Sequence, residues 1–368
     1  MKVLCVFGTR PEAIKMAPVL MELQKHSDFI STTVCVTAQH REMLDSVLEL
    51  FDIKANHDLD IMENNQGLSA LTANVFTRVD PVIAHERPDW VLVQGDTTTV
   101  MAATLTAFYH RVKVGHIEAG LRTWNKFHPF PEEVNRKIVD SVCDLHFAPT
   151  ETARKNLLRE GVRDESIRVT GNTIVDALQI IGARTYDWLQ GPLRGIRQDG
   201  RLILVTAHRR ENFGEPLKNI FRALVEIATR YPDVHIVYPV HMNPNVLRVA
   251  TTTLSNVPNI TLLRPLDYLS MVQLMKRAVL VLTDSGGLQE EMPTFGKPVL
   301  VLRETTERPE AVIAGTATVV GTSTESIVQH TSRILDTDGN NRAVNLKNPF
   351  GDGHASERIV RALVEFSA

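Results

Sequence analysis

This sequence has few cysteines, no large excess of one charge and no long apolar run. The 368 residues contain three cysteines, Cys5, Cys35 and Cys143, without paired or CxxC spacing, which predicts buried thiols in a reducing compartment rather than a disulfide framework. The formal net charge is −3, so the chain lacks the basic footprint of a nucleic-acid-binding protein. No apolar stretch approaches the length of a membrane span. We therefore expect neither a nucleic-acid nor a membrane partner.

A signal peptide and several ligand-binding motifs are also missing. Met1 and Lys2 lead straight into the strand-like run Val3–Phe7, so we expect no signal peptide and a cytoplasmic location. The turn after that run has one glycine, Gly8, which does not make the GxGxxG pattern of nicotinamide dinucleotide sites, and the P-loop pattern GxxxxGK[ST] is absent. No histidine, aspartate or glutamate cluster shows the spacing of metal ligands. The sequence thus predicts no metal and no cofactor.

The chain alternates between short β-branched runs and longer amphipathic segments. Its length exceeds one comfortable core, so two domains are expected. Helical segments such as Glu12–His26 and Arg41–Phe51 lie between the strand candidates. The predicted strands are Val3–Phe7, Thr32–Thr37, Trp90–Gln94, Val112–Glu118, Leu145–Ala148, Leu202–Thr206, His235–Pro239, Ile260–Leu263, Val279–Thr283, Val299–Leu302 and Ala317–Val320. This alternation predicts an α/β fold of two doubly wound, Rossmann-like domains, each a parallel sheet with helices on both faces.

The phase of this pattern breaks near Gly171, which places a domain boundary there. The N-terminal domain would span residues 1–171 and the C-terminal domain residues 172–368, with the last helix a candidate to pack back on the first domain. Gln190–Gly200, rich in Gly, Arg and Pro, is interpreted as a surface connection. Because ligands of doubly wound folds sit at the carboxyl ends of the strands, we expect both sets of strand ends to face one central cleft.

A strand-to-helix turn in the second half carries two adjacent glycines. Gly286 and Gly287 follow the apolar run Ala278–Leu282, at the point where a helix should begin. Glycine lets the backbone approach a ligand closely, and a helix N-terminus attracts anions, so the turn suits a diphosphate. Glu290 and Glu291 follow within one turn, where a carboxylate could hold ribose hydroxyls. The alternative is an ordinary strand-to-helix turn with acids on a solvated face.

Charged side chains also follow strands in the first half. Arg10 and Lys15 lie close to a predicted helix start and would compensate a bound anion, although a solvated basic pair is the alternative. Asp96 follows Trp90–Gln94; on this segment alone we favour a helix N-cap, by Asp96 or Thr97, over a carboxylate aimed at a ligand.

Five further acidic or basic positions stand out. Glu118 lies in a glycine-flanked strand end, a poor structural choice for a carboxylate and a good catalytic one. Glu132 and Arg136 are four residues apart and share a helix face, either as a site or as an exposed ion pair. In the second half His208 follows a strand beside two arginines, which should resist its protonation. His241 follows another strand and is given a structural role on this reading.

Together these segments resemble the non-hydrolysing UDP-N-acetylglucosamine 2-epimerases. As a set the matching pieces are highly specific, and they span nearly the whole chain in the same order. They are Phe7–Met16, Thr37–Leu44, Gly95–Thr99, Gly115–Arg122, Pro131–Arg136, His208–Glu211, Ser285–Glu291 and Thr305–Gly315. The chain departs from the family pattern at Asn125–Pro129, Leu266 and Met271.

The resemblance implies a glycosyltransferase-B type fold, a homodimer, and interconversion of UDP-GlcNAc and UDP-ManNAc, which supplies ManNAc units for surface polysaccharide. The catalytic residues it implies are Asp96, Glu118, Glu132 and His208. Arg136 would support Glu132. The UDP- and sugar-binding residues it implies are Arg10, Lys15, Arg136, Ser285, Gly286, Gly287, Glu291 and Arg308. Bacterial members have a second site at which UDP-GlcNAc is an allosteric activator; its counterparts here are Gln39, His40, Arg41, Arg209 and His241.

These residue types suit an elimination followed by an addition. The proton on C2 of the sugar is not next to a carbonyl, so its direct removal leaves no stabilised carbanion. Loss of UDP across C1–C2 avoids this and gives a 2-acetamidoglucal, with carboxylates moving protons on the two faces and cations stabilising the diphosphate. A retaining glycosyltransferase or a UDP-sugar-binding regulator would share the nucleotide grip without needing the three acids. A hydrolysing epimerase is the nearest alternative.

Overall fold

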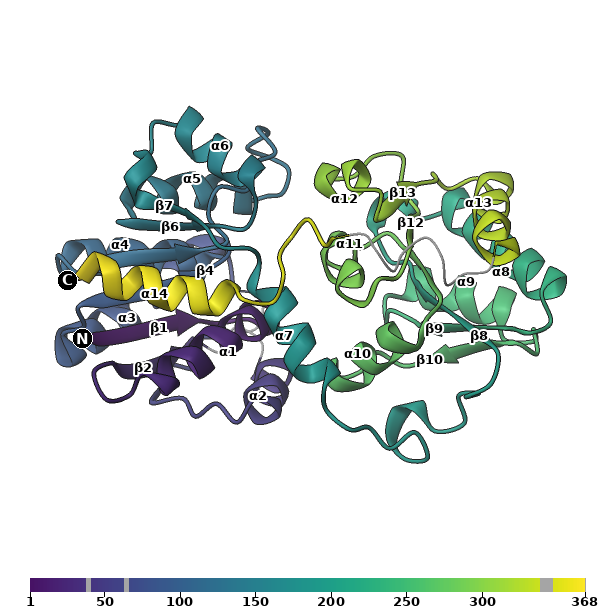
Figure 1. Cartoon of the computed structure of the whole chain (residues 1–368), viewed down its shortest axis with the longest axis horizontal. Helices are drawn as coiled ribbons and strands as arrows, with labels where there is room; N and C mark the ends of the chain where they lie inside the picture. The colour runs from purple at the N-terminus through teal and green to yellow at the C-terminus, as the bar shows by residue number, and fades with distance from the viewer. Residues whose placement is uncertain (38–40, 63–65, 338–346, 368) are drawn as a thin grey trace. The chain divides into compact units, whose positions relative to one another are not determined.

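The computed structural model describes residues 1–37, 41–62, 66–337 and 347–367 (Figure 1). It divides into two compact units, Met1–Ala177 with Phe350–Ala368, and Leu178–Pro349. The division falls inside helix α7 (Thr173–Gly182), and the C-terminal segment belongs with the first unit. Each unit is a parallel sheet with helices between successive strands, as the alternation of the sequence predicted.

The first unit contains a parallel sheet with the order β3-β2-β1-β4-β5-β6-β7 among the described residues. Its strands are β1 (Lys2–Phe7), β2 (Ser31–Val36), β3 (His57–Asp58), β4 (Trp90–Gln94), β5 (Lys113–Ile117), β6 (Leu145–Ala148) and β7 (Ile167–Val169). Its helices besides α7 are α1 (Arg10–Lys25), α2 (Arg41–Leu50), α3 (Leu68–Glu86), α4 (Thr98–Tyr109), α5 (Glu132–Val142), α6 (Glu151–Arg159) and α14 (Ala355–Ser367). Every residue of β4 is buried, because helices cover both faces of the sheet.

Helix α14 completes the first unit from the far end of the chain. It lies alongside α1 (Figure 1). The carboxylate of Asp176 on α7 accepts from the backbone N–H groups of Ala355 and Ser356 at 3.2 and 2.8 Å, and so satisfies the free donors at the start of α14. At its other end the indole of Trp90 donates to Ser367 at 2.8 Å.

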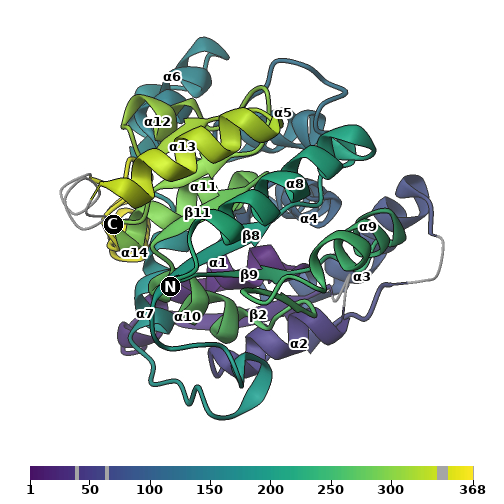
Figure 2. The same cartoon turned by 90° about the vertical axis from the view of Figure 1, so that its right-hand side faces the viewer.

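The second unit has a parallel sheet with the order β10-β9-β8-β11-β12-β13 among the described residues. Its strands are β8 (Arg201–Thr206), β9 (Val234–Pro239), β10 (Ile260–Leu263), β11 (Leu280–Thr283), β12 (Val299–Val301) and β13 (Ala317–Val319). Its helices are α8 (Glu215–Arg230), α9 (Pro244–Leu254), α10 (Tyr268–Arg277), α11 (Gly286–Glu291), α12 (Pro309–Ile313) and α13 (Thr324–Asp336). Helix α8 lies between α9 and α13, as Figure 2 shows.

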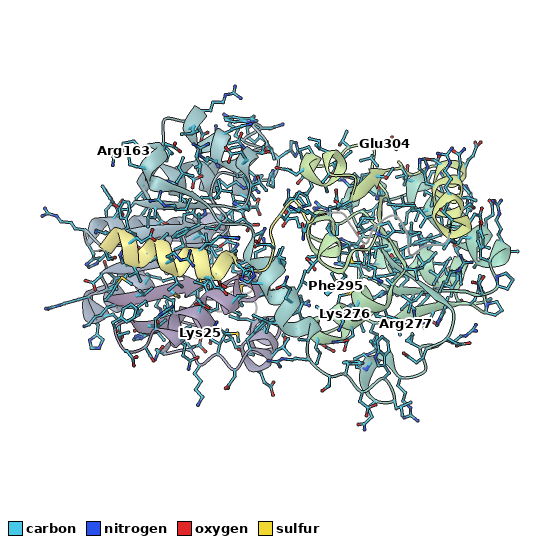
Figure 3. The ribbon with its side chains drawn as sticks, in the orientation of Figure 1. Lys25, Arg163, Lys276, Arg277, Phe295 and Glu304 are labelled. Carbon is cyan, nitrogen blue, oxygen red and sulfur yellow. The ribbon has the colours of Figure 1, made fainter. Side chains whose placement is uncertain are left out.

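The last residue of α7 is anchored in the second unit. Lys276 on α10 donates a hydrogen bond to the carbonyl of Gly182. A Cβ added to Gly182 would stand 3.2 Å from the ring of Phe295 (Figure 3 labels Lys276 and Phe295). The absence of a side chain at Gly182 therefore allows this close packing.

Candidate active site

Both sheets reverse their winding direction at one pair of neighbouring strands. The pair is β1 and β4 in the first unit, and β8 and β11 in the second. In doubly wound folds the carboxyl ends of such strands are where ligands bind, because the following loops turn apart there. Arg10, Asp96, His208 and Ser285, all predicted from the sequence, come shortly after these four strands.

Glu118 follows β5, the neighbour of β4, in a left-handed backbone conformation with a φ of 69°. Lys15 Nζ donates to its two carboxylate oxygens at 2.5 and 2.7 Å. Gln94 Nε2 donates at 2.5 Å and Asn172 Nδ2 at 3.0 Å. A positive φ is uncommon outside glycine and persists where the surroundings fix it. Glu118 and Lys15, which were predicted separately as site residues, thus form a pair. Gln94 and Asn172, which the sequence analysis did not select, also donate to Glu118.

Asp96 is held by a cation rather than by a helix end. Its carboxylate accepts from Arg136 Nε and Nη2 at 2.9 and 2.7 Å, and its backbone carbonyl accepts from Asn135 Nδ2 at 2.8 Å. The N-cap of α4 is Thr97, whose hydroxyl accepts from Val100 N at 3.4 Å. The predicted N-cap is therefore confirmed for Thr97 and not for Asp96, whose carboxylate is paired with Arg136 at the strand end.

The spacing and the resemblance predicted that Arg136 pairs with Glu132, but in the structure Arg136 has other partners. Besides Asp96 it contacts Glu133, with Nη1 3.1 Å from Oε2. Glu133 is fully buried and also accepts from the backbone N–H groups of Thr123 and Trp124 at 3.0 and 2.9 Å. Glu132, the first residue of α5, has a buried Oε2 with no hydrogen-bond partner among the described residues. Arg136 thus supports Asp96 and Glu133, whereas Glu132 Oε2 has no hydrogen-bond partner among the described residues.

A fifth acid, Glu12, lies at the start of α1 and was not predicted as a site residue. It accepts from the backbone N–H groups of Gly8 and Thr9 at 2.8 and 2.7 Å, and from the Thr97 hydroxyl at 2.5 Å. Burial raises the pKa of Glu12, while these hydrogen bonds act to lower it. Glu12 therefore ties the ends of β1 and β4 together, beside Arg10 at the first position of the helix.

In the second unit a buried carboxylate organises the strand ends. Asp284, directly after β11, is fully buried, and its Oδ2 accepts from the backbone N–H groups of His208 and Arg209 at 2.8 Å each. It also accepts from Asn212 Nδ2 at 3.0 Å. Asp284 therefore fixes the loop after β8 against β11. Arg209 Nε is buried without a hydrogen-bond partner among the described residues.

His208 and His241 stack on one another, with ring centroids 5.3 Å apart and planes inclined by 22°. The pKa of His208 is lowered, first by burial and then by His241 and Arg209, while Asp284 opposes the shift. The expected resistance to protonation is confirmed in direction, although burial and not the neighbouring arginines is its main cause. His241 is thus placed next to a predicted catalytic residue.

The diglycine turn begins the short helix α11, with Ser285 as its N-cap. A Cβ on Gly287 would stand 3.2 Å from Glu291 Oε1, and one on Gly286 would stand 3.8 Å from Arg209 Nη2. The Glu291 carboxylate and the Arg209 guanidinium therefore lie over the two glycines. Arg308 Nε donates to the buried Glu290, so the loop before α12 is attached to α11.

Part of the predicted second site cannot be placed. Gln39 and His40 lie outside the described residues, and Arg41 is described only as the first residue of α2. Arg209 and His241 are both close to His208, as given above. Among the described residues no helix is long and apolar enough to cross a membrane.

Comparisons with known proteins identify the family of this chain. The family described as UDP-N-acetylglucosamine 2-epimerase matches residues 21–364. The UDP-N-acetylglucosamine 2-epimerase of Escherichia coli strain K12 is 51% identical over 370 residues, which cover 99% of this chain and 98% of that protein.

Two solved structures are similar over nearly their full length. The crystal structure of the UDP-GlcNAc 2-epimerase from Neisseria meningitidis bound to UDP-GlcNAc has a TM-score of 0.90 and 49% identity, covering 99% of this chain and all of that one. A putative UDP-N-acetylglucosamine 2-epimerase from Listeria monocytogenes has a TM-score of 0.93 and 47% identity, covering 100% of this chain and 96% of that one.

Proposed function

Because this chain belongs to the UDP-N-acetylglucosamine 2-epimerase family, a family of isomerases, we propose that it interconverts UDP-GlcNAc and UDP-ManNAc while retaining the nucleotide. The supporting observation is the set of acids at the carboxyl end of the first sheet. Glu118 is paired with Lys15 and Asp96 with Arg136, and Glu132 has a buried oxygen without a partner among the described residues. A protein that only binds a nucleotide-sugar has no use for three such carboxylates.

The reaction proceeds by loss of UDP across C1–C2 to a 2-acetamidoglucal, followed by re-addition to the other face. A carboxylate takes the C2 proton on one face of the sugar, and an acid returns a proton on the other face. These two groups are drawn from Asp96, Glu118 and Glu132. The side chains around Glu118 and Asp96 fix the carboxylates in advance, so that little reorganisation is needed when charge develops.

The UDP portion is assigned to the second unit. Ser285, Gly286 and Gly287 would receive the diphosphate, with the arginines Arg209 and Arg308 nearby and Glu291 for the ribose. Arg209 Nε, buried without a partner among the described residues, is a donor suited to a phosphate oxygen. His208, whose pKa is lowered, would be largely neutral near pH 7 and could donate one hydrogen bond to the departing diphosphate.

Three further properties are proposed with this function. UDP-GlcNAc would also act as an activator through Gln39, His40, Arg41, Arg209 and His241. The protein would work as a homodimer, and its product would supply ManNAc units for surface polysaccharide. Exposed Phe108 and Tyr109 at the end of α4 are apolar groups that a second copy could cover. Sedimentation equilibrium would show a mass of two chains, and a single-chain mass would contradict the dimer.

Incubation with UDP-GlcNAc alone, followed by NMR of the products, tests the reaction. The expected result is a mixture of UDP-GlcNAc and UDP-ManNAc that is also reached from UDP-ManNAc. Stoichiometric free ManNAc would show a hydrolysing epimerase instead. Transfer of the sugar to an added acceptor would show a glycosyltransferase, and binding without turnover would show a regulator.

A further inference from the structure

A buried histidine lies between the strand ends that carry the proposed acids. His116 on β5 has a relative exposure of 1%. Its Nδ1 is 2.6 Å from Asp140 Oδ1, and its Nε2 is 2.7 Å from the backbone carbonyl oxygen of Gly95. Neither the predicted site nor the proposed mechanism uses this residue.

The two partners of His116 decide how many protons the ring carries. A backbone carbonyl can only accept, and so can an ionised carboxylate. A neutral imidazole has a single N–H and could satisfy only one of them. Burial alone would raise the pKa of Asp140, but His116 and Arg122 outweigh it and lower this pKa to about 2, which keeps Asp140 ionised. A hydrogen bond from the ring to each of these two acceptors requires a proton on each ring nitrogen.

Asp140 connects this ring to the turn that holds Glu118. Its Oδ2 accepts from the backbone N–H of Gly120 at 3.2 Å and from Arg122 Nη2 at 2.7 Å. Arg122 in turn contacts Glu160 at 2.6 Å. The buried imidazolium is thus neutralised by Asp140, and the second cation, Arg122, by Asp140 and Glu160.

The other end of the ring fixes the segment that holds Asp96. Gly95 has a φ of 86° and is fixed through both its backbone groups, because its N–H donates to the Ile117 carbonyl at 3.0 Å while its own carbonyl contacts His116. Asp96 is the next residue. One side chain therefore connects the end of β4, the end of β5 and helix α5, and these three segments carry Asp96, Glu118 and Glu132.

We propose that His116 is a positioning residue for the epimerisation, held as an imidazolium between Asp140 and the Gly95 carbonyl so that Asp96 and Glu118 keep their spacing. This inference rests on the proposed function for its kinetic consequence, whereas the doubly protonated ring is inferred from the two short contacts of His116. A displacement of a catalytic group by about 1 Å can cost on the order of 100-fold in rate, so a residue that touches no substrate can still control turnover.

His146 provides a matched control on the next strand. It pairs with His116 in the register of β5 and β6, and it is similarly buried at 2% exposure. It differs in its partner, because its Nε2 contacts the backbone carbonyl of Asp140 at 2.8 Å rather than the carboxylate. Burial lowers the pKa of His146, so this ring is expected to be neutral.

The first experiment is ¹⁵N NMR of the histidine rings in the unmodified protein near neutral pH, with the His116 signals assigned from a His116→Gln variant. We expect two protonated ring nitrogens for His116 and one for His146. A single protonated nitrogen in His116 would overturn the proposal. This measurement does not depend on the substrate, and it remains decisive if the His116→Gln variant fails to fold, because the signals can then be assigned from through-bond correlations.

The second experiment compares kinetics. We expect His116→Gln to lower kcat roughly 10- to 100-fold with little change in KM, and His146→Gln to change kcat less than about threefold at comparable melting temperatures. In an Asp96→Asn background the His116 effect should shrink to a few-fold, because the two residues act together. An unchanged kcat in His116→Gln, or a full effect in the Asp96→Asn background, would overturn the positioning role. Absence of epimerisation by the unmodified protein would instead contradict the proposed function.

Discussion

The two units wind their sheets in the same way but place different side chains at the strand ends. In the first unit the ends of β4 and β5 carry carboxylates paired with cations, Asp96 with Arg136 and Glu118 with Lys15. In the second unit the carboxylate directly after the switch-point strand β11, Asp284, accepts from backbone N–H groups, and the predicted site residues beside it are histidine, arginine and glycine. Under the proposed function, the same scaffold would serve proton transfer in one unit and anion binding in the other.

The largest expected effect is a loss of turnover when the proposed proton-transfer acids are replaced. Asp96→Asn, Glu118→Gln and Glu132→Gln should each lower kcat about 100- to 10,000-fold, because a positioned acid or base contributes that much to the transition state. Glu151→Gln is the control: Glu151 opens α6 as Glu132 opens α5, but its carboxylate is 55% exposed in a pair with Arg154. Product NMR gives the rates, and calorimetry should show unchanged UDP affinity. Near-normal turnover in all three variants would make the acids structural.

The second prediction concerns activation by substrate. UDP-ManNAc alone should be converted slowly, and a trace of UDP-GlcNAc should accelerate it about 5- to 150-fold, the range of common allosteric coupling energies. An activator must bind one conformation of the protein better than another. Replacing Gln39 and His40 by Ala, or His241 by Ala, should flatten the response more than it weakens UDP binding. Hyperbolic kinetics without activation in the unmodified protein would remove this site.

The third prediction tests whether anion binding belongs to the second unit. Arg308→Ala should weaken UDP binding about tenfold, since a hydrogen bond to a charged group is worth about 1.5 kcal/mol or more. Arg10→Ala should also weaken UDP binding. If it weakens UDP binding more than Arg308→Ala does, anion binding does not belong mainly to the second unit. Arg222→Ala, which removes an exposed pair with Glu215, serves as the control in calorimetry with UDP. Unchanged affinity in both test variants would place the nucleotide elsewhere.

The smallest effect is a pH dependence of stability from His208. Its pKa is lowered in the folded protein, so below its ordinary value of about 6.5 the unfolded chain binds a proton that the folded chain does not. Stability is therefore lost as the pH falls through that value. Thermal melting between about pH 8 and pH 5 should fall less steeply for His208→Gln than for the unmodified protein. Parallel curves would mean that His208 is not protected from protonation.

Local pattern was sufficient to predict most of the sheets. Trp90–Gln94, Leu145–Ala148 and Ile260–Leu263 are strands with the predicted bounds, because short, mostly apolar segments between turns are typical of buried strands. The strands β3 and β7 were not predicted, since two and three residues are too short to show a period. The division between the two units falls within helix α7 and not in a loop. A continuous helical pattern in the sequence gives no signal of such a division.

The predicted site residues came from motifs, whereas their partners required the fold. Spacing assigned Arg136 to Glu132, but Glu133 is the residue whose carboxylate is buried against the 123–124 backbone, so Arg136 meets Glu133 and Asp96. Asn172 reaches Glu118 from 54 positions away in the chain, a contact that no local pattern indicates. The domain bounds and site roles assigned from the sequence stay predictions.

The most direct test of the central claim, that acids of the first unit move protons while UDP leaves and returns, is turnover in D₂O. NMR of UDP-GlcNAc and UDP-ManNAc at equilibrium should show deuterium at C2 in both, because the proton that leaves one face is replaced from solvent by a different group on the other. Epimerisation with full retention of the original hydrogen at C2 would contradict the claim.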